Sequence, residues 1–390
     1  MYDVDTSYMT TRMKQSGGEL RTRALASVVW VAVAAAAVAL LAAGPQVAPS
    51  GAGPALPAEK HLGNVRQITF GGQNAEAYFS ADDKWLIFQH AGKSVACDQI
   101  YLVPTAALLN GPGHANAEGL PPEARLVSTG QGRTTCSYVF PADDKLLFAS
   151  THGASAACPE PPDYTKGYVW AVYPSYKIYT AKMDGSDVKV LTNAPGYNAE
   201  ATITHDGRKI AFTSTRDGDL DIYTMNADGS GVKRLTTELG YDGGPFWSAD
   251  GKKIVYRAYH PKTAEEIADY KALLARSLIR PANFELWVMD ADGSHKRQIT
   301  HNGAANFAPF WHPDGKRIVF ASNMADPKNP RNFDLYLIGA DGKGLERITF
   351  DPDFDAFPMF TSDGKHLVWA SNRYGSQPHE TNVFLADWVE

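Results

Sequence analysis

The chain has 390 residues, of which 44% are hydrophobic and 21% are charged, so its composition is that of an ordinary globular protein and excludes a disordered or collagen-like chain. The formal net charge of −6 argues against a general nucleic-acid-binding protein, which normally carries a basic surplus. Three cysteines are too few for a disulfide scaffold.

The first recognisable element is an uncharged apolar segment, residues 24–43, which follows Arg21 and Arg23. A basic region before an apolar run is typical of an export signal, and about 20 apolar residues are also enough to span a bilayer. We therefore predict a signal peptide or signal anchor within residues 1–44, with the rest of the chain in the periplasm or otherwise outside the cytoplasm. The Pro/Ala/Gly-rich residues 45–64 are expected to be a flexible linker.

From residue 65 onward the chain repeats one four-strand unit. The first half of each unit is a hairpin, in which an aromatic strand, an Asp-Gly turn and an alternating apolar strand follow one another. The clearest copy is Phe246-Trp-Ser-Ala-Asp-Gly-Lys-Lys-Ile-Val-Tyr256. The other copies begin at Ile203, Trp311 and Phe360, and two copies with Asp83 or Asp144 in place of the glycine begin at Phe79 and Phe140.

A second hairpin follows each first one, as in Leu220-Asp-Ile-Tyr-Thr-Met-Asn-Ala-Asp-Gly-Ser230 with Lys233-Arg-Leu-Thr236. The last unit ends at residues 382–386 without a fourth strand, whereas an unpaired fourth strand, residues 66–70, precedes the first unit. This arrangement predicts an all-β, six-bladed β-propeller closed by an N-terminal strand in the last blade.

These motifs resemble the WD40-like (PD40) repeats of TolB-type propellers, with the consensus Ser-Pro-Asp-Gly-Lys, Ile-Ala-Phe, Asp-Ile-Tyr, Asn-Ala-Asp-Gly and Arg-Leu-Thr. The resemblance covers about residues 65–388 and implies a propeller domain over residues 65–390. TolB carries an α/β domain before its propeller, and no such domain lies between the apolar segment and the first strand here. Similar propellers occur beside prolyl-oligopeptidase-type catalytic domains and in pectate-fragment lyases, so the resemblance does not decide the function.

Three insertions are expected on one face of the propeller, which we call the insertion face: residues 152–175, 260–283 and 324–332. The Asp-Gly turns lie on the opposite face, the turn face. Long loops on a rigid scaffold often carry binding sites, although neutral variation in length is the alternative for each loop. In the second insertion, the capping box Thr263-Ala-Glu-Glu266 and the helical spacing of Tyr270, Leu274 and Leu278 predict a helix that runs to Arg280.

The links into the innermost strands share a polar pattern that we expect at the mouth of the central channel, where it would bind the ligand. The candidate ligand-binding residues are Glu76, Glu200, Asp242, Asn306 and Asp355. Converging carboxylates favour a bound cation, a basic partner side chain or raised pKa values. The alternative is that each residue caps backbone amides of its own loop.

Calcium or magnesium suits such all-oxygen ligands, and calcium is the candidate cofactor. Asp351, Asp353 and Asp355 have a spacing suggestive of calcium, without the glycine and distal glutamate of an EF-hand. Cys97, Cys136 and Cys158 all fall in loops of the insertion face, where an exported protein would form a disulfide; all three pairings are open.

The motifs of common enzymes are missing, since the sequence has no Gly-x-Ser-x-Gly elbow, zinc-protease helix, P-loop or Rossmann fingerprint. The sequence therefore favours an exported, non-enzymatic binding or scaffold propeller of the cell envelope. We expect it to recognise a protein, peptide or cell-wall glycan over the insertion face and channel mouth, to bind no nucleic acid, and to contact the membrane only through its N-terminal segment. The alternative is a carbohydrate-active or peptide-processing enzyme with a cation at the channel carboxylates, for which His152, His260 and His301 are candidate bases.

Overall fold

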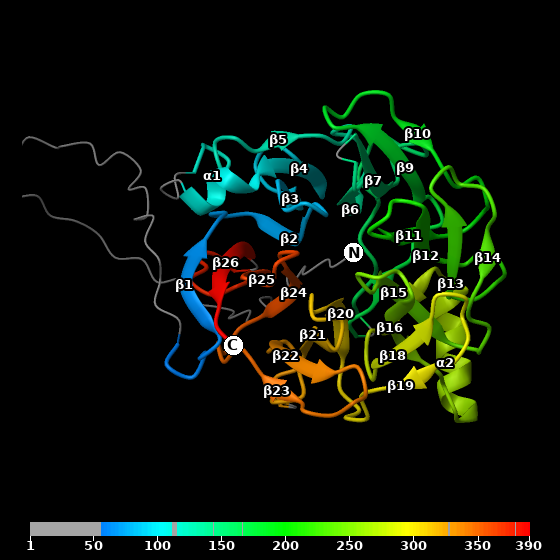
Figure 1. Cartoon of the computed structure of the whole chain (residues 1–390). Coiled ribbons are helices and arrows are strands. Elements are labelled where there is room, and N and C mark those ends of the chain that lie inside the picture. Colours follow the sequence, from blue (N-terminus) through cyan, green and yellow to red (C-terminus); the bar gives the residue numbers. More distant parts are fainter. Residues whose placement is uncertain (1–55, 111–114, 143, 166, 327, 379) are drawn as a thin grey trace, which may run out of the picture. The chain divides into compact units, whose positions relative to one another are not determined.

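The computed structural model describes residues 56–110, 115–142, 144–165, 167–326, 328–378 and 380–390; the predicted export signal lies outside these ranges. Within them the chain forms six four-stranded antiparallel sheets around a central axis (Figure 1), which confirms the predicted all-β six-bladed propeller. None of the helices in this part of the chain is long and apolar enough to cross a membrane.

Each blade runs from an innermost strand to an outermost one, which is only two residues long in the first five blades (Figure 1). The first blade is β2 (Gln73–Phe79), β3 (Trp85–Ala91), β4 (Gln99–Pro104) and β5 (Arg125–Leu126), and the second is β6 (Thr134–Val139), β7 (Lys145–Ser150), β9 (Lys177–Lys182) and β10 (Lys189–Val190). The third is β11 (Asn198–Ile203), β12 (Lys209–Ser214), β13 (Asp221–Asn226) and β14 (Lys233–Arg234), and the fourth is β15 (Tyr241–Trp247), β16 (Lys253–Tyr259), β18 (Glu285–Asp290) and β19 (Arg297–Gln298). The fifth is β20 (Asn306–Trp311), β21 (Arg317–Ser322), β22 (Asp334–Gly339) and β23 (Glu346–Arg347).

The sixth blade contains β24 (Asp355–Phe360), β25 (His366–Ser371) and β26 (Asn382–Trp388), and β1 (Leu62–Gln67) lies at its outer edge. β1 pairs antiparallel with β26, from Leu62 opposite Trp388 to Gln67 opposite Phe384. It starts earlier than the strand predicted at residues 66–70. The residues before it are held by Glu59, which is only 2% exposed and accepts hydrogen bonds from the backbone N–H groups of Leu56 and Phe350. This part of the predicted linker is therefore packed against the propeller.

The turns of the first hairpins show why glycine recurs there. Gly251 has a φ of 66°, a left-handed conformation that glycine adopts without steric cost. Asp83 stands at the matching position of the first blade with a φ of 60°, and its carboxylate accepts a hydrogen bond from the Ser362 backbone N–H of the neighbouring blade at 2.9 Å. The contact between blades compensates for a residue that the turn alone would disfavour.

The second insertion departs from its prediction. Helix α2 (Ala264–Leu274) begins with the predicted capping box, in which Thr263 and Glu266 satisfy each other's backbone N–H groups. It ends at Leu274 rather than Arg280, because Ser277 has a φ of 57° and the chain then enters β17 (Leu278–Ile279). β17 pairs with β8 (Trp170–Ala171) of the first insertion, and the buried pairing removes Leu278 from the predicted helix. The link between β4 and β5 carries a short helix, α1 (Thr105–Asn110).

Candidate functional site

Every innermost strand contains a β-bulge, and the residue at the bulge has a positive φ. Bulges change the direction in which residues face, and here they turn one residue of each blade toward the channel. These six residues are Glu76, Cys136, Glu200, Gly244, Ala308 and Phe357, with φ values from 49° to 59°. Together they line a cavity of about 30 Å³, enough for one or two water molecules.

Glu76 and Glu200 are the predicted ligand-binding residues that the structure brings to this cavity. The other three, Asp242, Asn306 and Asp355, lie two positions earlier in their strands, are at most 1% exposed and do not line it. The predicted ring of five is therefore divided into two layers, because the bulge changes which side chain faces the channel.

The two glutamates have the same structural role in different blades. Glu76 Oε2 accepts a hydrogen bond from the backbone N–H of Cys136 in the next blade, and Glu200 Oε2 accepts one from Gly244 in the blade after its own, both at 2.9 Å. Both glutamates therefore accept hydrogen bonds from backbone amides of the next blade, whereas the alternative considered from the sequence placed such contacts within each residue's own loop.

Glu200 is also paired with the chain's own arginine. Arg257 Nη2 lies 2.5 Å from Glu200 Oε1 and 2.7 Å from the hydroxyl of Tyr241. Burial acts to raise the pKa of Glu200, but Arg257 and the hydrogen bonds outweigh it, so that the pKa is lowered. The clustered carboxylates were expected to attract a basic side chain from a partner. For Glu200, Arg257 of the propeller itself provides that side chain.

An aromatic layer closes the channel directly beside this cavity. The rings of Tyr78 and Tyr138 stack with 4.9 Å between centroids, and Tyr78 contacts Phe246 of the opposite blade at 5.9 Å. Phe246 continues to Phe310 at 5.9 Å. Since side chains from opposite blades contact each other across the axis, they fill the channel at this layer.

The remaining predicted site residues have partners of their own. Asp242 Oδ1 lies 3.2 Å from His260 Nε2, and Asn306 Nδ2 donates to the carbonyl of Phe284 at 2.7 Å. Asp355 accepts hydrogen bonds from Trp369 Nε1 at 3.0 Å and Arg373 Nη2 at 2.8 Å.

Asp355 thus faces Arg373, and Asp351 accepts a hydrogen bond from the Asp353 backbone N–H. The structure therefore does not assemble these three aspartates as a calcium site. In the described part of the chain, no group of three or more His, Cys, Asp or Glu side chains could hold a metal ion.

The cysteines resolve into one disulfide and one thiol. Cys97 and Cys158 are bonded, which ties the first insertion to the first blade. Cys136 is left as a thiol at the small cavity, where burial, and after it the Glu76 carboxylate, raises its pKa well above the usual value. A thiol with a raised pKa is a poor nucleophile and a poor metal ligand.

His152 makes a contact that resembles a catalytic pair but recurs as a structural feature. Its Nδ1 lies 2.8 Å from Ser150 Oγ. In the third blade Arg216 Nε donates to Ser214 Oγ at 3.0 Å, with the same sequence spacing. The serine at the end of the second strand thus anchors the residue two positions later, whether that residue is histidine or arginine.

A groove of about 500 Å³ lies on the insertion face, and all three predicted insertions contribute to it. Its lining residues are Tyr168, Trp170, Arg280, Pro281, Ala282, Asn283, Phe284, Asn302, Gly303, Ala304, Ala305, Phe307, Asn323, Met324, Pro330, Phe333 and Phe354. The volume is in the range of sites that enclose small ligands or short peptide segments. We call this site the insertion groove.

The wall of the insertion groove is held in place by long-range contacts. β8 pairs with β17, so that Ala171 lies opposite Leu278 and Trp170 opposite Ile279. Helix α2 is fixed by Tyr270, whose hydroxyl donates to Asp219 and lies 2.6 Å from the carbonyl oxygen of Gly240. The insertions therefore form a preformed surface.

The sequence pattern predicted the insertions but not the aromatic floor of the groove. Phe307 is the second residue of β20, whereas Phe333 and Phe354 lie in the links that lead directly into β22 and β24. Each stands next to a buried polar residue at the start of a strand, Asn306, Asp334 or Asp355. That repeated Phe–polar neighbourhood is the signal from which the floor could have been found.

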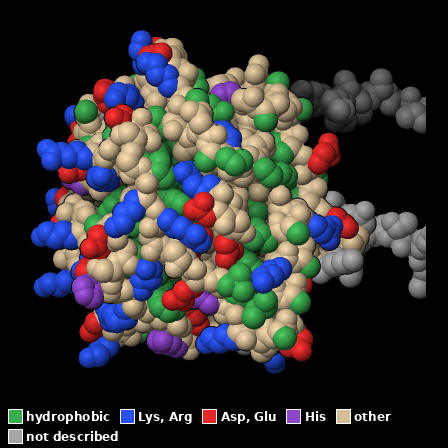
Figure 2. Space-filling model, turned by 90° about the vertical axis from the view of Figure 1, so that its right-hand side faces the viewer, with side chains coloured by type: hydrophobic (Ala, Val, Ile, Leu, Met, Phe, Trp, Pro, Cys, Tyr) green, Lys and Arg blue, Asp and Glu red, His purple; other side chains and the backbone are tan. Residues whose placement is uncertain are grey.

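The opposite, turn face carries charges that pair locally. Figure 2, a view from the side, shows several Lys and Arg side chains projecting at its left edge, and Lys, Arg, Asp and Glu side chains interspersed over the rest of the view. Typical pairs are Asp250–Lys252 at 3.6 Å and Asp363–Lys365 at 2.9 Å, which join the residues of one turn. These are exposed ion pairs of low energy and do not form a site.

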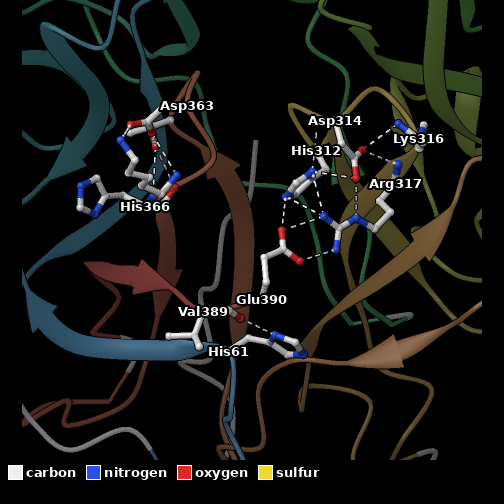
Figure 3. A network of polar contacts seen from close by, with 11 residues as sticks. His61, His312, Asp314, Lys316, Arg317, Asp363, His366, Val389 and Glu390 are labelled. Atoms are coloured by element: carbon white, nitrogen blue, oxygen red, sulfur yellow. Dashed lines mark hydrogen bonds and ion pairs between the residues drawn. The ribbon is translucent and has the colours of Figure 1, made fainter.

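A polar network joins the fifth blade to the last residues of the chain (Figure 3). His312 and Arg317 both face Glu390, and Arg317 Nη2 lies 2.9 Å from its carboxylate. His61 Nδ1 lies 2.6 Å from the carbonyl oxygen of Val389. The network fastens the end of β26 to its neighbours, which is a structural function.

Comparisons with known proteins agree with this architecture. Residues 147–272 match the family model of the TolB beta propeller domain, PD40. A search of curated proteins found no match. Among solved structures, the chain is similar to a TolB candidate from Agrobacterium tumefaciens, with 19% identity and a TM-score of 0.52 over 82% of this chain and 91% of that one.

Two further structures are TolB from Acinetobacter baumannii and an oligogalacturonate lyase in complex with manganese. The first has 16% identity and a TM-score of 0.47 over 82% of this chain and 65% of that one. The second has 15% identity and a TM-score of 0.47 over 84% of this chain and 93% of that one. At such identities the likeness concerns the fold, and the function has to be argued from the site.

Proposed function

We propose that this chain, a TolB-like six-bladed β-propeller, is an exported binding or scaffold protein of the cell envelope that recognises a protein or peptide partner in the insertion groove. One observation carries the proposal: three insertions from separate blades form a single groove of about 500 Å³, whereas the channel cavity measures about 30 Å³. The sequence pattern of residues 24–43 and the Cys97–Cys158 disulfide support a location outside the cytoplasm.

The rigidity of the scaffold favours binding. The disulfide, the β8–β17 pairing and the contacts of Tyr270 hold the insertions before any partner arrives. A preformed surface loses little conformational entropy on association, so more of the contact energy appears as affinity.

The enzymatic alternative would place a cation at the channel carboxylates. Glu76 and Glu200 use their oxygens for backbone amides, and Glu200 is also paired with Arg257. A cation would have to displace Arg257 from a buried ion pair, which makes the groove the better-supported site.

The proposal is tested by crosslinking and affinity capture of the full chain in envelope extract. The groove variant carries Phe333→Ser and Phe354→Ser, two partly exposed positions, and the channel variant carries Glu76→Gln and Glu200→Gln. We expect one dominant partner that the wild type and the channel variant retain and the groove variant loses. Loss in the channel variant alone, or capture of glycan or calcium without any protein, would contradict the proposal. Thermal unfolding of each variant verifies that it is folded.

A further inference from the structure

We propose that the insertion groove binds the C-terminal end of a peptide, with an apolar side chain on the aromatic floor and the terminal carboxylate at Arg280. The inference rests on the proposed function and specifies the chemistry of the partner.

The floor of the groove is aromatic and partly open to solvent. Phe307 contacts Phe333 edge to face, with 4.8 Å between ring centroids, and lies 6.2 Å from Phe354. Tyr168 is 47% exposed at the rim. Covering such a surface with an apolar side chain releases the water that it now holds in contact with apolar atoms.

The amide groups in the groove are largely engaged within the protein. Asn302 Oδ1 accepts a hydrogen bond from the Ala304 backbone N–H at 3.0 Å, and Asn323 Oδ1 accepts one from Ala305 at 3.0 Å. Asn323 Nδ2 also donates to the carbonyl of Pro330 at 3.1 Å. Few of these amide groups remain available for hydrogen bonds to the hydroxyls of a sugar, so the lining favours an apolar ligand over a glycan.

The charge of the groove is of one sign. Of the described residues that line it, Arg280 alone carries a full charge, and no carboxylate faces the ligand, although the whole chain has a net charge of −6. Arg280 contacts Asp269 through Nε at 3.2 Å and Nη2 at 3.4 Å, an exposed and therefore weak pair. The planar guanidinium has further N–H groups with which to bind a second carboxylate.

The position of Arg280 favours a peptide end. The exposed Asn283 follows three residues later, and its amide offers a donor and an acceptor, as a peptide group requires. In a C-terminal residue the apolar side chain and the carboxylate stem from the same Cα, and the floor and Arg280 both line this one groove. Charge complementarity and the apolar floor thus point to the same ligand.

The test is isothermal titration calorimetry of the full chain with acetyl-Ala-Ala-Phe-Leu and acetyl-Ala-Ala-Leu-Phe, each as free acid and as C-terminal amide. We expect the free acids to bind at least fivefold more tightly than the amides. Arg280→Gln should remove that difference, and Arg280→Lys should retain part of it. Arg276→Gln, an exposed arginine of the same insertion outside the groove lining, should leave it unchanged.

Equal affinities of acid and amide, or no binding of either acid at millimolar concentration, would overturn the proposal. Arg280-dependent binding of laurate or of an N-acetylglucosamine-containing cell-wall fragment, in place of the peptides, would also overturn it. If the peptides fail while the captured partner still depends on Phe333 and Phe354, the proposed function stands and only this inference falls.

Discussion

Glu59 and Arg373 form a buried ion pair between the residues that precede β1 and the sixth blade. Glu59 Oε1 lies 3.0 Å from Arg373 Nη2, and the two side chains are 0% and 1% exposed. Arg373 also binds Asp355 and lies 5.3 Å from the ring centre of Trp369. The guanidinium thus joins a segment outside the repeats to the core of the last blade.

We expect Glu59→Gln to lower the free energy of unfolding by about 2–3 kcal/mol, because a buried arginine loses one of two carboxylate partners. Arg373 keeps its second partner, Asp355, so the free energy of unfolding falls less than it would for a buried charge without any partner. Urea denaturation measures the change. Lys60→Gln is the matched control, since Lys60 is 69% exposed in its pair with Glu346 and should change stability by no more than about 0.5 kcal/mol. Equal effects of the two substitutions would show that the buried pair adds nothing.

The two channel glutamates should differ in their contribution to stability. Glu200→Gln leaves the buried Arg257 without its carboxylate and should cost about 2–4 kcal/mol. Glu76→Gln keeps a carbonyl oxygen that can accept the hydrogen bond from Cys136, and should cost about 1 kcal/mol. Chemical denaturation of both variants decides the order, and a larger loss for Glu76→Gln would refute the assigned roles.

Asp334 should make the stability depend on pH. Burial raises its pKa to about 7, although Arg347 lies 2.8 Å away and acts in the opposite direction. The folded state therefore binds this proton more tightly than the unfolded state, so that stability falls as pH rises from about 4 to 7, by up to about 1.4 kcal/mol per pH unit.

Asp334→Asn should flatten this dependence, which urea unfolding at pH 5 and pH 7 measures. Asp221, whose pKa burial raises to about 6, acts in the same direction and leaves a residual slope in the variant. Asp353→Asn, at an exposed position, is the control. An unchanged slope in Asp334→Asn would show that Asp334 is ionised at low pH in the folded protein.

The cysteines should differ in reactivity. Reduction of the Cys97–Cys158 disulfide, which spans 61 residues, should lower the free energy of unfolding by about 2–4 kcal/mol.

Cys136 should react with a thiol reagent at least ~100-fold more slowly in the native protein than after unfolding, since its pKa is raised and its side chain is half-buried. Ellman's reagent with and without denaturant measures this, and rapid labelling of the native protein would contradict the enclosed site.

The repeats made the fold predictable because each hairpin is a local structure. The Asp-Gly turn before Lys252 and the alternation of apolar residues after it depend on neighbours in sequence, and both are present in the structure. The capping box of Thr263 and Glu266 is equally local and was predicted correctly, whereas the end of that helix depended on β8, about 100 residues away, and was not.

The sequence by itself therefore determined the six blades, their strand order and the positions of the insertions, because turns and strands of this kind are specified within one hairpin. The tertiary structure alone decided the disulfide pairing, the bulges that turn Glu76 and Glu200 inward while Asp242 stays buried, and the meeting of three insertions in one groove. Those features arise where blades distant in sequence pack together, and a one-dimensional repeat pattern carries no information about which side chains meet there.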